Sequence, residues 1–152
     1  MLWVLGTVAV GAILAWRGVV IANTDWDYSL HSTAYVIGRF HYDMSLLAPF
    51  PAFAAAYAAM RYTFRARYSE AFGQANFWTM FAGSLMILSP PLWLEREGAA
   101  LSYSHPAAAF AFWSGVMSVG YLLTVMSLIL FVVVVIGALR HRHTPADGAI
   151  ET

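Results

Sequence analysis

Four long apolar stretches constrain this chain of 152 residues more than any other feature of its sequence. They run approximately over residues 2–22, 36–60, 75–94 and 109–139. A helix needs about 20 mostly apolar residues to cross the hydrocarbon core of a bilayer. Hydrophobic side chains make up 61% of the chain and charged ones 11%, a composition too apolar for a soluble domain. The sequence therefore predicts an all-α integral membrane protein, a bundle of four helices.

The arginines predict how this bundle is oriented. Arg61, Arg65 and Arg67 lie between the second and third stretches, and Arg140 and Arg142 follow the fourth. Short loops rich in basic residues stay on the cytoplasmic side of a membrane. We therefore expect both termini in the cytoplasm, and a multi-pass protein of a bacterial-type inner (cytoplasmic) membrane.

Four further features of the sequence bear on its domain organisation, its targeting and its binding partners. No repeat or linker divides the chain, so we expect one transmembrane domain over residues 1–143 and a polar, disordered tail over residues 144–152. The first stretch lacks a small-residue cleavage pattern, which favours a retained helix over a signal peptide. The chain has no cysteine, which excludes disulfides and thiolate metal sites. Its formal net charge is zero, so we expect no nucleic acid partner.

Prolines mark two of the predicted helices. Pro49 and Pro51 lie inside the second stretch and should kink that helix, because proline removes a backbone donor. The pair Pro90 and Pro91 predicts the end of the third helix at the outer face.

Three ionisable residues lie close together near the outer end of the second helix, in YVIGRFHYD. Arg39 and Asp43 are four residues apart, so they share one helical face and can form an ion pair that fixes helix register. The alternative is a proton or ion path lined by both side chains. Arg17, near the outer end of the first helix, is expected to extend toward the lipid headgroups.

Two histidines are candidate ligands. His41 lies two residues from Arg39 and from Asp43. It is either a neutral buried histidine bonded to a neighbouring helix or an axial ligand of haem, which helical bundles hold between facing helices. His31 lies in NTDWDYSLHST, whose Asp and His side chains could hold a divalent metal or simply be solvated and cap helices.

The segment IANTDWDYSLHSTAYVIGRFHYDMSL resembles the part of haem-copper oxidase subunit I, of the cytochrome c and quinol oxidases, that joins its ninth helix to its tenth. Further along, SEAFGQANFW resembles the S-E-A-L-G-K-I-H-F-W pattern of that family. The positions that keep the family pattern in the first segment are residues 21–23, Leu30, His31, Thr33, Tyr35, Phe40, His41 and Tyr42.

The resemblance implies roles for individual residues. His41 matches the axial ligand of the low-spin haem, and His31 matches a ligand of the redox-inert magnesium or manganese site. Arg39 stands where the family has the histidine that ligates the oxygen-reducing haem, a role that a permanently protonated guanidinium cannot take. Ser32 replaces the metal-binding Asp, and Asn76 replaces a histidine of the third helix.

These substitutions favour a chain that has lost catalysis. In addition, four helices cannot rebuild the twelve-helix catalytic core that the resemblance implies. We expect a small, non-catalytic, structural or assembly subunit of a respiratory haem-copper-oxidase-like redox complex. One alternative is an electron-transferring haem subunit with His41 as axial ligand. Another is one half of a split terminal oxidase subunit I. The expected partners are the membrane and either other subunits of a redox complex or further copies of this chain.

Overall fold

The computed structural model describes residues 1–22, 33–64, 68–96 and 107–142, and these residues contain helices and no strand. Helix α1 spans Leu2–Ala22, α4 spans Glu70–Arg96 and α5 spans Ala107–Arg142. Between α1 and α4 lie α2 (Thr33–Leu47), α3 (Pro49–Ala58) and a short π-helix, η2 (Ala59–Thr63). The four apolar stretches each fall within these helices, which confirms the all-α prediction for the described residues. The predicted tail lies outside them.

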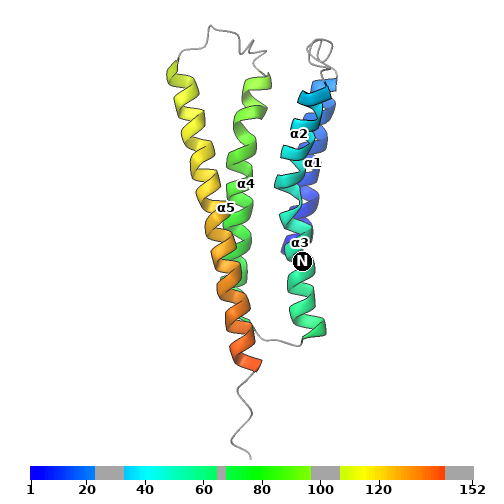
Figure 1. The fold of residues 1–152 in the computed structure, drawn as a ribbon, viewed down its shortest axis with the longest axis vertical. Coiled ribbons are helices and arrows are strands. Elements are labelled where there is room, and N and C mark those ends of the chain that lie inside the picture. The colour runs from blue at the N-terminus through cyan, green and yellow to red at the C-terminus, as the bar shows by residue number, and fades with distance from the viewer. Residues whose placement is uncertain (23–32, 65–67, 97–106, 143–152) are drawn as a thin grey trace, which may run out of the picture.

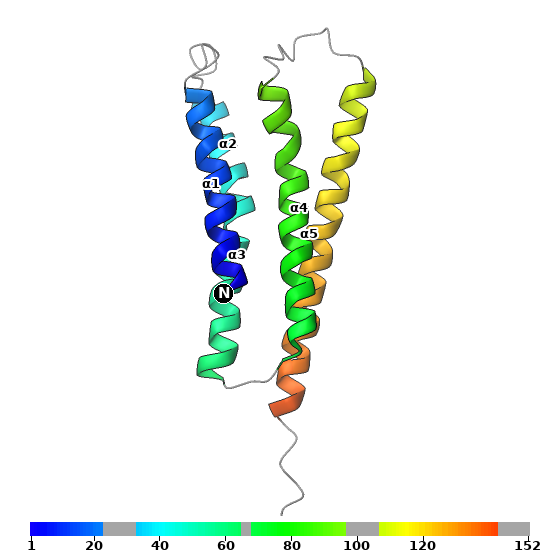
Figure 2. The same ribbon diagram turned by 180° about the vertical axis from the view of Figure 1, so that it is seen from behind.

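Helices α1, α4 and α5 and the consecutive segments α2, α3 and η2 run alongside one another (Figures 1 and 2). The end of α1 and the start of α2 lie at the same end of the molecule as the end of α4 and the start of α5. Helix α5 ends at the opposite end, near the start of α4. Helix α4 packs mainly against α5, and α1 packs against α2, α3 and α4.

Helices α2, α3 and η2 make one rod despite the prolines. Regular helix is interrupted at Ala48, yet the backbone there keeps helical angles, φ −55° and ψ −36°. The Ala48 N–H still donates to the Met44 carbonyl at 2.8 Å. Pro49 occupies the first position of α3, where its missing N–H costs least. The predicted kink is therefore a local interruption between two helices that continue each other.

The prediction that the third helix ends at Pro90 and Pro91 is wrong, because α4 continues to Arg96. These prolines lack the N–H groups that would bond the carbonyls of Met86 and Ile87. The Ser89 hydroxyl donates to the Met86 carbonyl at 3.1 Å, and the Tyr42 hydroxyl donates to the Ile87 carbonyl at 3.3 Å. Side chains thus satisfy both freed acceptors, as membrane helices require when they contain proline.

Aromatic side chains fill the core between α1, α3 and α4. The ring centroid of Trp3 lies 4.7 Å from that of Phe53 and 5.2 Å from that of Phe77. Such aromatic pairs contribute about 0.5–1.5 kcal/mol each beyond their buried area. Trp3 also contacts Phe50 and stacks on Tyr57 at 5.9 Å. This cluster joins the start of α1 to the other rods.

Helices α4 and α5 approach each other through two glycines. A Cβ atom added to Gly83 would lie 2.8 Å from the Gly120 carbonyl oxygen, and one added to Gly120 would lie 2.8 Å from the Gly83 carbonyl oxygen. Both distances are shorter than Cβ contacts in proteins. Small residues allow this backbone contact, which is typical of helix pairs in membranes.

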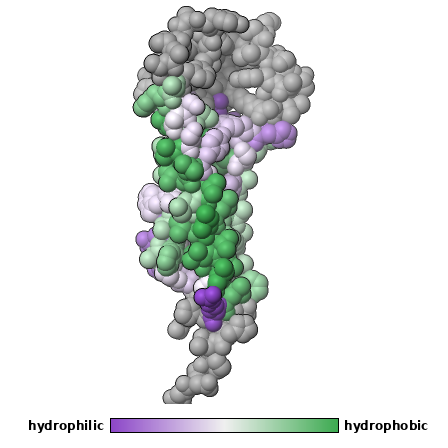
Figure 3. Space-filling model, turned by 60° about the vertical axis from the view of Figure 1, so that its left-hand side comes forward, coloured by the Kyte–Doolittle hydropathy of each residue, from purple (hydrophilic) through white to green (hydrophobic). Residues whose placement is uncertain are grey.

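Two of the helices are long and apolar enough to cross a membrane, by length and composition alone. They are the segments Leu2–Val19 of α1 and Ala111–Arg140 of α5. The break at Ala48 leaves α2 with 15 residues and α3 with 10, each too short to cross separately. Only 17% of the α5 segment is buried inside the molecule. With the α5 side turned forward, Figure 3 shows a mostly hydrophobic surface between the two ends.

Candidate functional site

The described part of the chain contains a buried ion pair between α1 and α2. The Arg17 Nη1 atom donates to the Asp43 Oδ1 atom at 2.8 Å. The two side chains are only 6% and 15% exposed. A charge held in an apolar surrounding is costly unless an opposite charge lies beside it, so each of these groups makes the other tolerable. The expectation that Arg17 extends toward headgroups is therefore wrong.

The sequence predicted a different partner for Asp43. The Arg39 side chain lies outside the described side chains, so the Arg39–Asp43 pair stays a prediction. The sequence contains a signal for the Arg17–Asp43 pair, but a search for charge pairs within one helix does not find it. Arg17 and Asp43 are opposite charges in the apolar parts of two consecutive helices, and consecutive helices pack side by side.

Tyr42 connects this ion pair to the rest of the bundle. It is the neighbour of Asp43 in α2, it is half-buried, and its hydroxyl is the donor to the Ile87 carbonyl of α4. Asp43 therefore holds α2 to α1 while Tyr42 holds the same turn to α4. The two adjacent side chains fix the position of α2 between its neighbours.

His41 lies on the outside of the bundle. Its side chain is exposed, and so is the adjacent Phe40, at 58%. The two ring centroids lie 6.1 Å apart. No hydrogen bond joins the imidazole to another described residue. Within this chain, His41 is therefore neither buried nor bonded to a neighbouring helix, and a ligand role would require the iron outside the bundle that this chain forms.

A second polar cluster lies in the core and joins three helices. The Asn76 Nδ2 atom in α4 donates to the Tyr57 hydroxyl of α3 at 2.9 Å. The Ser127 hydroxyl of α5 donates to the Asn76 backbone carbonyl at 3.0 Å and also contacts Asn76 Oδ1. Asn76 and Ser127 are fully buried. Buried amides need such partners, so the asparagine has a structural role where the resemblance implied a lost histidine.

The candidate metal ligand His31 lies outside the described residues. Within the described part, no group of three or more His, Asp or Glu side chains could hold a metal ion. His41 and Asp43 do not belong to such a group, since the imidazole is exposed and the Asp43 carboxylate is paired with Arg17. Haem ligation needs a single imidazole per face, so this result does not concern His41 as a haem ligand.

Comparison with known proteins identifies the family. The family model described as Cytochrome C and Quinol oxidase polypeptide I matches residues 1–123. Cytochrome c oxidase subunit 1 of Cereibacter sphaeroides is 35% identical over 135 residues, which cover 89% of this chain and 24% of the relative. Cytochrome c oxidase subunit 1 of Eremothecium gossypii is 34% identical over 144 residues, 95% of this chain and 27% of the relative.

The chain thus spans about a quarter of the length of these two relatives. The matched region includes α1, α2, α3 and α4, and with them Arg17, His41, Asp43 and Asn76. The resemblance seen in the sequence is confirmed, and the chain belongs to the cytochrome c and quinol oxidase polypeptide I family.

Proposed function

We propose that this protein is a small, non-catalytic membrane subunit of a respiratory haem-copper-oxidase-like complex. The observation that carries the proposal is the outward position of Phe40 and His41 on α2. These residues belong to the stretch that most resembles the family, yet this chain leaves them uncovered. A polar imidazole facing lipid is unfavourable, so another protein surface covers this face in the assembled complex. That surface belongs to other subunits or to a second copy of the chain.

The proposal places all four rods across a bacterial-type inner (cytoplasmic) membrane. The apolar spans of α1 and α5 support it, as does the low burial of the α5 span, because a core helix of a soluble protein would be covered by its own fold. Arg61, at the end of the α2–η2 rod, and Arg140, at the end of α5, lie toward one end of the molecule. Their position favours the cytoplasm for that end and for both termini.

Polar contacts between the helices support a structural role. The Arg17–Asp43 pair, the Tyr42 bond to α4 and the cluster around Asn76 hold its helices together. Arg39 stands where the family resemblance places an iron ligand, and guanidinium has no lone pair to offer a metal. The chain therefore keeps the family's sequence pattern in this region and lacks one of its reactive groups.

The exposure of His41 also favours a second candidate function, an electron-transferring haem subunit. An imidazole without a hydrogen bond to another described residue has its unprotonated ring nitrogen available, which fits an iron ligand. His41 and a histidine of a partner or of a second copy would then hold the iron. Haem bound in this way supplies one-electron transfer.

Purification through a tag on this chain in mild detergent tests the first proposal. We expect the chain to elute within a larger assembly that contains other oxidase-type subunits. A free, stable monomer without any partner would contradict the subunit role.

The absorption spectrum of the same preparation, oxidised and reduced with dithionite, separates the two candidate functions. Haem bands that disappear in His41→Ala, with the fold intact, support the electron-transfer role. The matched control is His141→Ala, which removes a histidine at the end of α5. Bands that are absent, or equal in both variants, leave the structural role as the function of this chain.

A further inference from the structure

A cavity of about 260 Å³ lies where the start of α1, the end of the α2–η2 rod and the start of α4 come together. Pockets for drug-sized ligands are larger, roughly 300–1,000 Å³, whereas one water molecule needs only about 10–15 Å³ of cavity volume. The cavity therefore has the size of a small polar group of several heavy atoms. It is separate from Arg17, Asp43 and His41, which do not line it.

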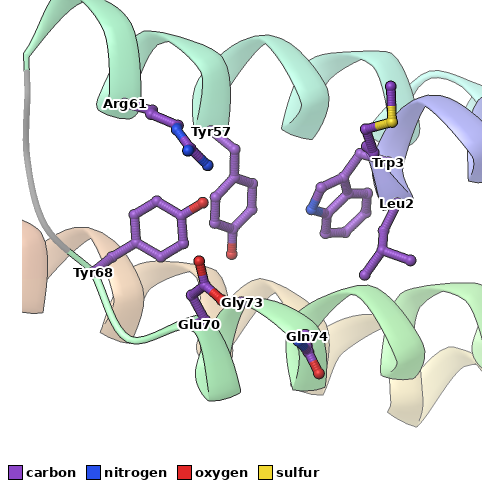
Figure 4. Close-up of a pocket in the computed structure, with 9 residues that line it drawn as sticks. Leu2, Trp3, Tyr57, Arg61, Tyr68, Glu70, Gly73 and Gln74 are labelled. Carbon is purple, nitrogen blue, oxygen red and sulfur yellow. The ribbon is translucent and has the colours of Figure 1, made fainter.

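Aromatic rings form much of the wall of this cavity (Figure 4). Trp3 and Tyr57 are stacked with centroids 5.9 Å apart, and Tyr68 meets Tyr57 edge-on at 5.2 Å. Gly73 leaves the space beside them open, since a Cβ atom there would lie 3.3 Å from the Tyr68 ring. Faces of aromatic rings attract cations, so one part of the cavity suits a positively charged group.

Two opposite charges reach the same cavity from different helices. Figure 4 shows Arg61 and Glu70 on opposite sides, both directed toward the space beside Tyr57 and Tyr68. Both residues are exposed, and within the described part of the chain they form no ion pair with each other. A guanidinium binds phosphate oxygens, and a carboxylate accepts hydrogen bonds from an ammonium group. The side chains of the lining thus offer one partner for an anion and one for a cation.

We propose that this cavity binds a zwitterionic phosphoethanolamine group, with the phosphate at Arg61 and the ammonium at Glu70 and the aromatic rings. The source is the headgroup of phosphatidylethanolamine or free phosphoethanolamine. The lipid source rests on the proposed membrane placement, in which these helix ends lie at the cytoplasmic headgroup layer. A purely anionic headgroup would meet the Glu70 carboxylate, and choline has no N–H to donate to it. The charges therefore select a zwitterion, and the hydrogen bond that the Glu70 carboxylate can accept favours a primary ammonium over choline.

Native mass spectrometry of the full chain tests the proposal, after equilibration with equal amounts of phosphatidylethanolamine, phosphatidylglycerol and phosphatidylcholine. We expect retention of phosphatidylethanolamine in preference to the other two. Arg61→Gln and Glu70→Gln should each reduce that retention about fivefold, the effect of one exposed charge contact. Both residues are exposed, so the fold should tolerate these changes. Arg140→Gln is the matched control, because it removes an exposed arginine outside the cavity.

Equal retention of phosphatidylglycerol, or retention that Glu70→Gln does not change, would overturn the assignment. Saturable binding of free phosphoethanolamine without lipid adducts would support the same chemistry from a soluble source. Incorporation of the chain into lipid nanodiscs is measured in the same experiment. Failure to incorporate contradicts the membrane placement, whereas incorporation without a lipid adduct or phosphoethanolamine binding contradicts this inference alone.

Discussion

Asp43 is predicted to have a large effect on stability among the described side chains, because Arg17 beside it is only 6% exposed. Removing one partner of a buried ion pair typically costs about 3–5 kcal/mol, because the buried charge that remains loses this counter-charge. We expect Asp43→Ala to lower the thermal unfolding temperature of the detergent-solubilised protein strongly. The double variant Arg17→Leu with Asp43→Leu should recover most of the loss, because apolar residues can replace a buried pair at little cost.

The control is Arg140→Leu, which removes an exposed arginine and should leave the unfolding temperature unchanged. A double variant as unstable as Asp43→Ala would show that the pair does more than neutralise two charges. Arg39→Leu completes the series. A loss as large as that of Asp43→Ala would support the Arg39–Asp43 pair predicted from the sequence.

The sequence identified Asp43 as a paired charge, but it did not reveal the contact with Arg17. Spacing of four residues tests only pairs within one helix, and the Arg17–Asp43 contact crosses 26 positions of the chain. The cluster of Asn76, Tyr57 and Ser127 was missed for the same reason, since it joins three helices. His41 was found by its resemblance to a motif, and its exposure depends on how α2 is rotated, which charge spacing alone does not determine.

The contact of α4 with α5 depends on Gly83 and Gly120. A methyl group at either position would lie 2.8 Å from a carbonyl oxygen of the other helix, and a backbone atom cannot move away as a flexible side chain can. Overpacking of this kind typically costs about 1–3 kcal/mol. We therefore expect Gly83→Ala and Gly120→Ala each to lower the unfolding temperature, measured by circular dichroism in detergent.

Gly115→Ala and Gly137→Ala are the matched controls on α5. No atom lies within 4 Å of a Cβ added at either position, so alanine should there be neutral or stabilise the helix. Equal losses at all four positions would mean that glycine acts through the backbone and not through the helix contact.

Helix positions were more predictable than helix ends. The apolar stretches predicted all four rods, because burial in an apolar surrounding requires a long run of apolar residues whatever the neighbours are. The ends depend on contacts that a linear pattern does not contain. Pro90 and Pro91 predicted a stop, and the Tyr42 hydroxyl from another helix supplies one of the donors that lets α4 continue.

The whole molecule has a further testable property, its orientation in the membrane. Arg61, Arg65 and Arg67 favour the cytoplasm for the connection between η2 and α4, and Arg140 favours the same side for the end of α5. The chain contains no cysteine, so single cysteines can be introduced without background labelling. Tyr62→Cys is suitable for the cytoplasmic end because Tyr62 is 77% exposed at the end of its rod. Ser104→Cys reports on the connection between α4 and α5.

We use cells whose outer membrane is permeabilised and whose inner membrane is intact. We expect a membrane-impermeant maleimide to label Ser104→Cys in these cells, and to label Tyr62→Cys only after the inner membrane is permeabilised as well. The reason is that four crossings place these two connections on opposite sides, whereas two crossings by α1 and α5 alone could place them on the same side. Labelling of both cysteines in intact cells would contradict the four-helix arrangement. Labelling of Tyr62→Cys alone would keep four crossings and reverse the orientation, which would mean that the arginines do not determine it.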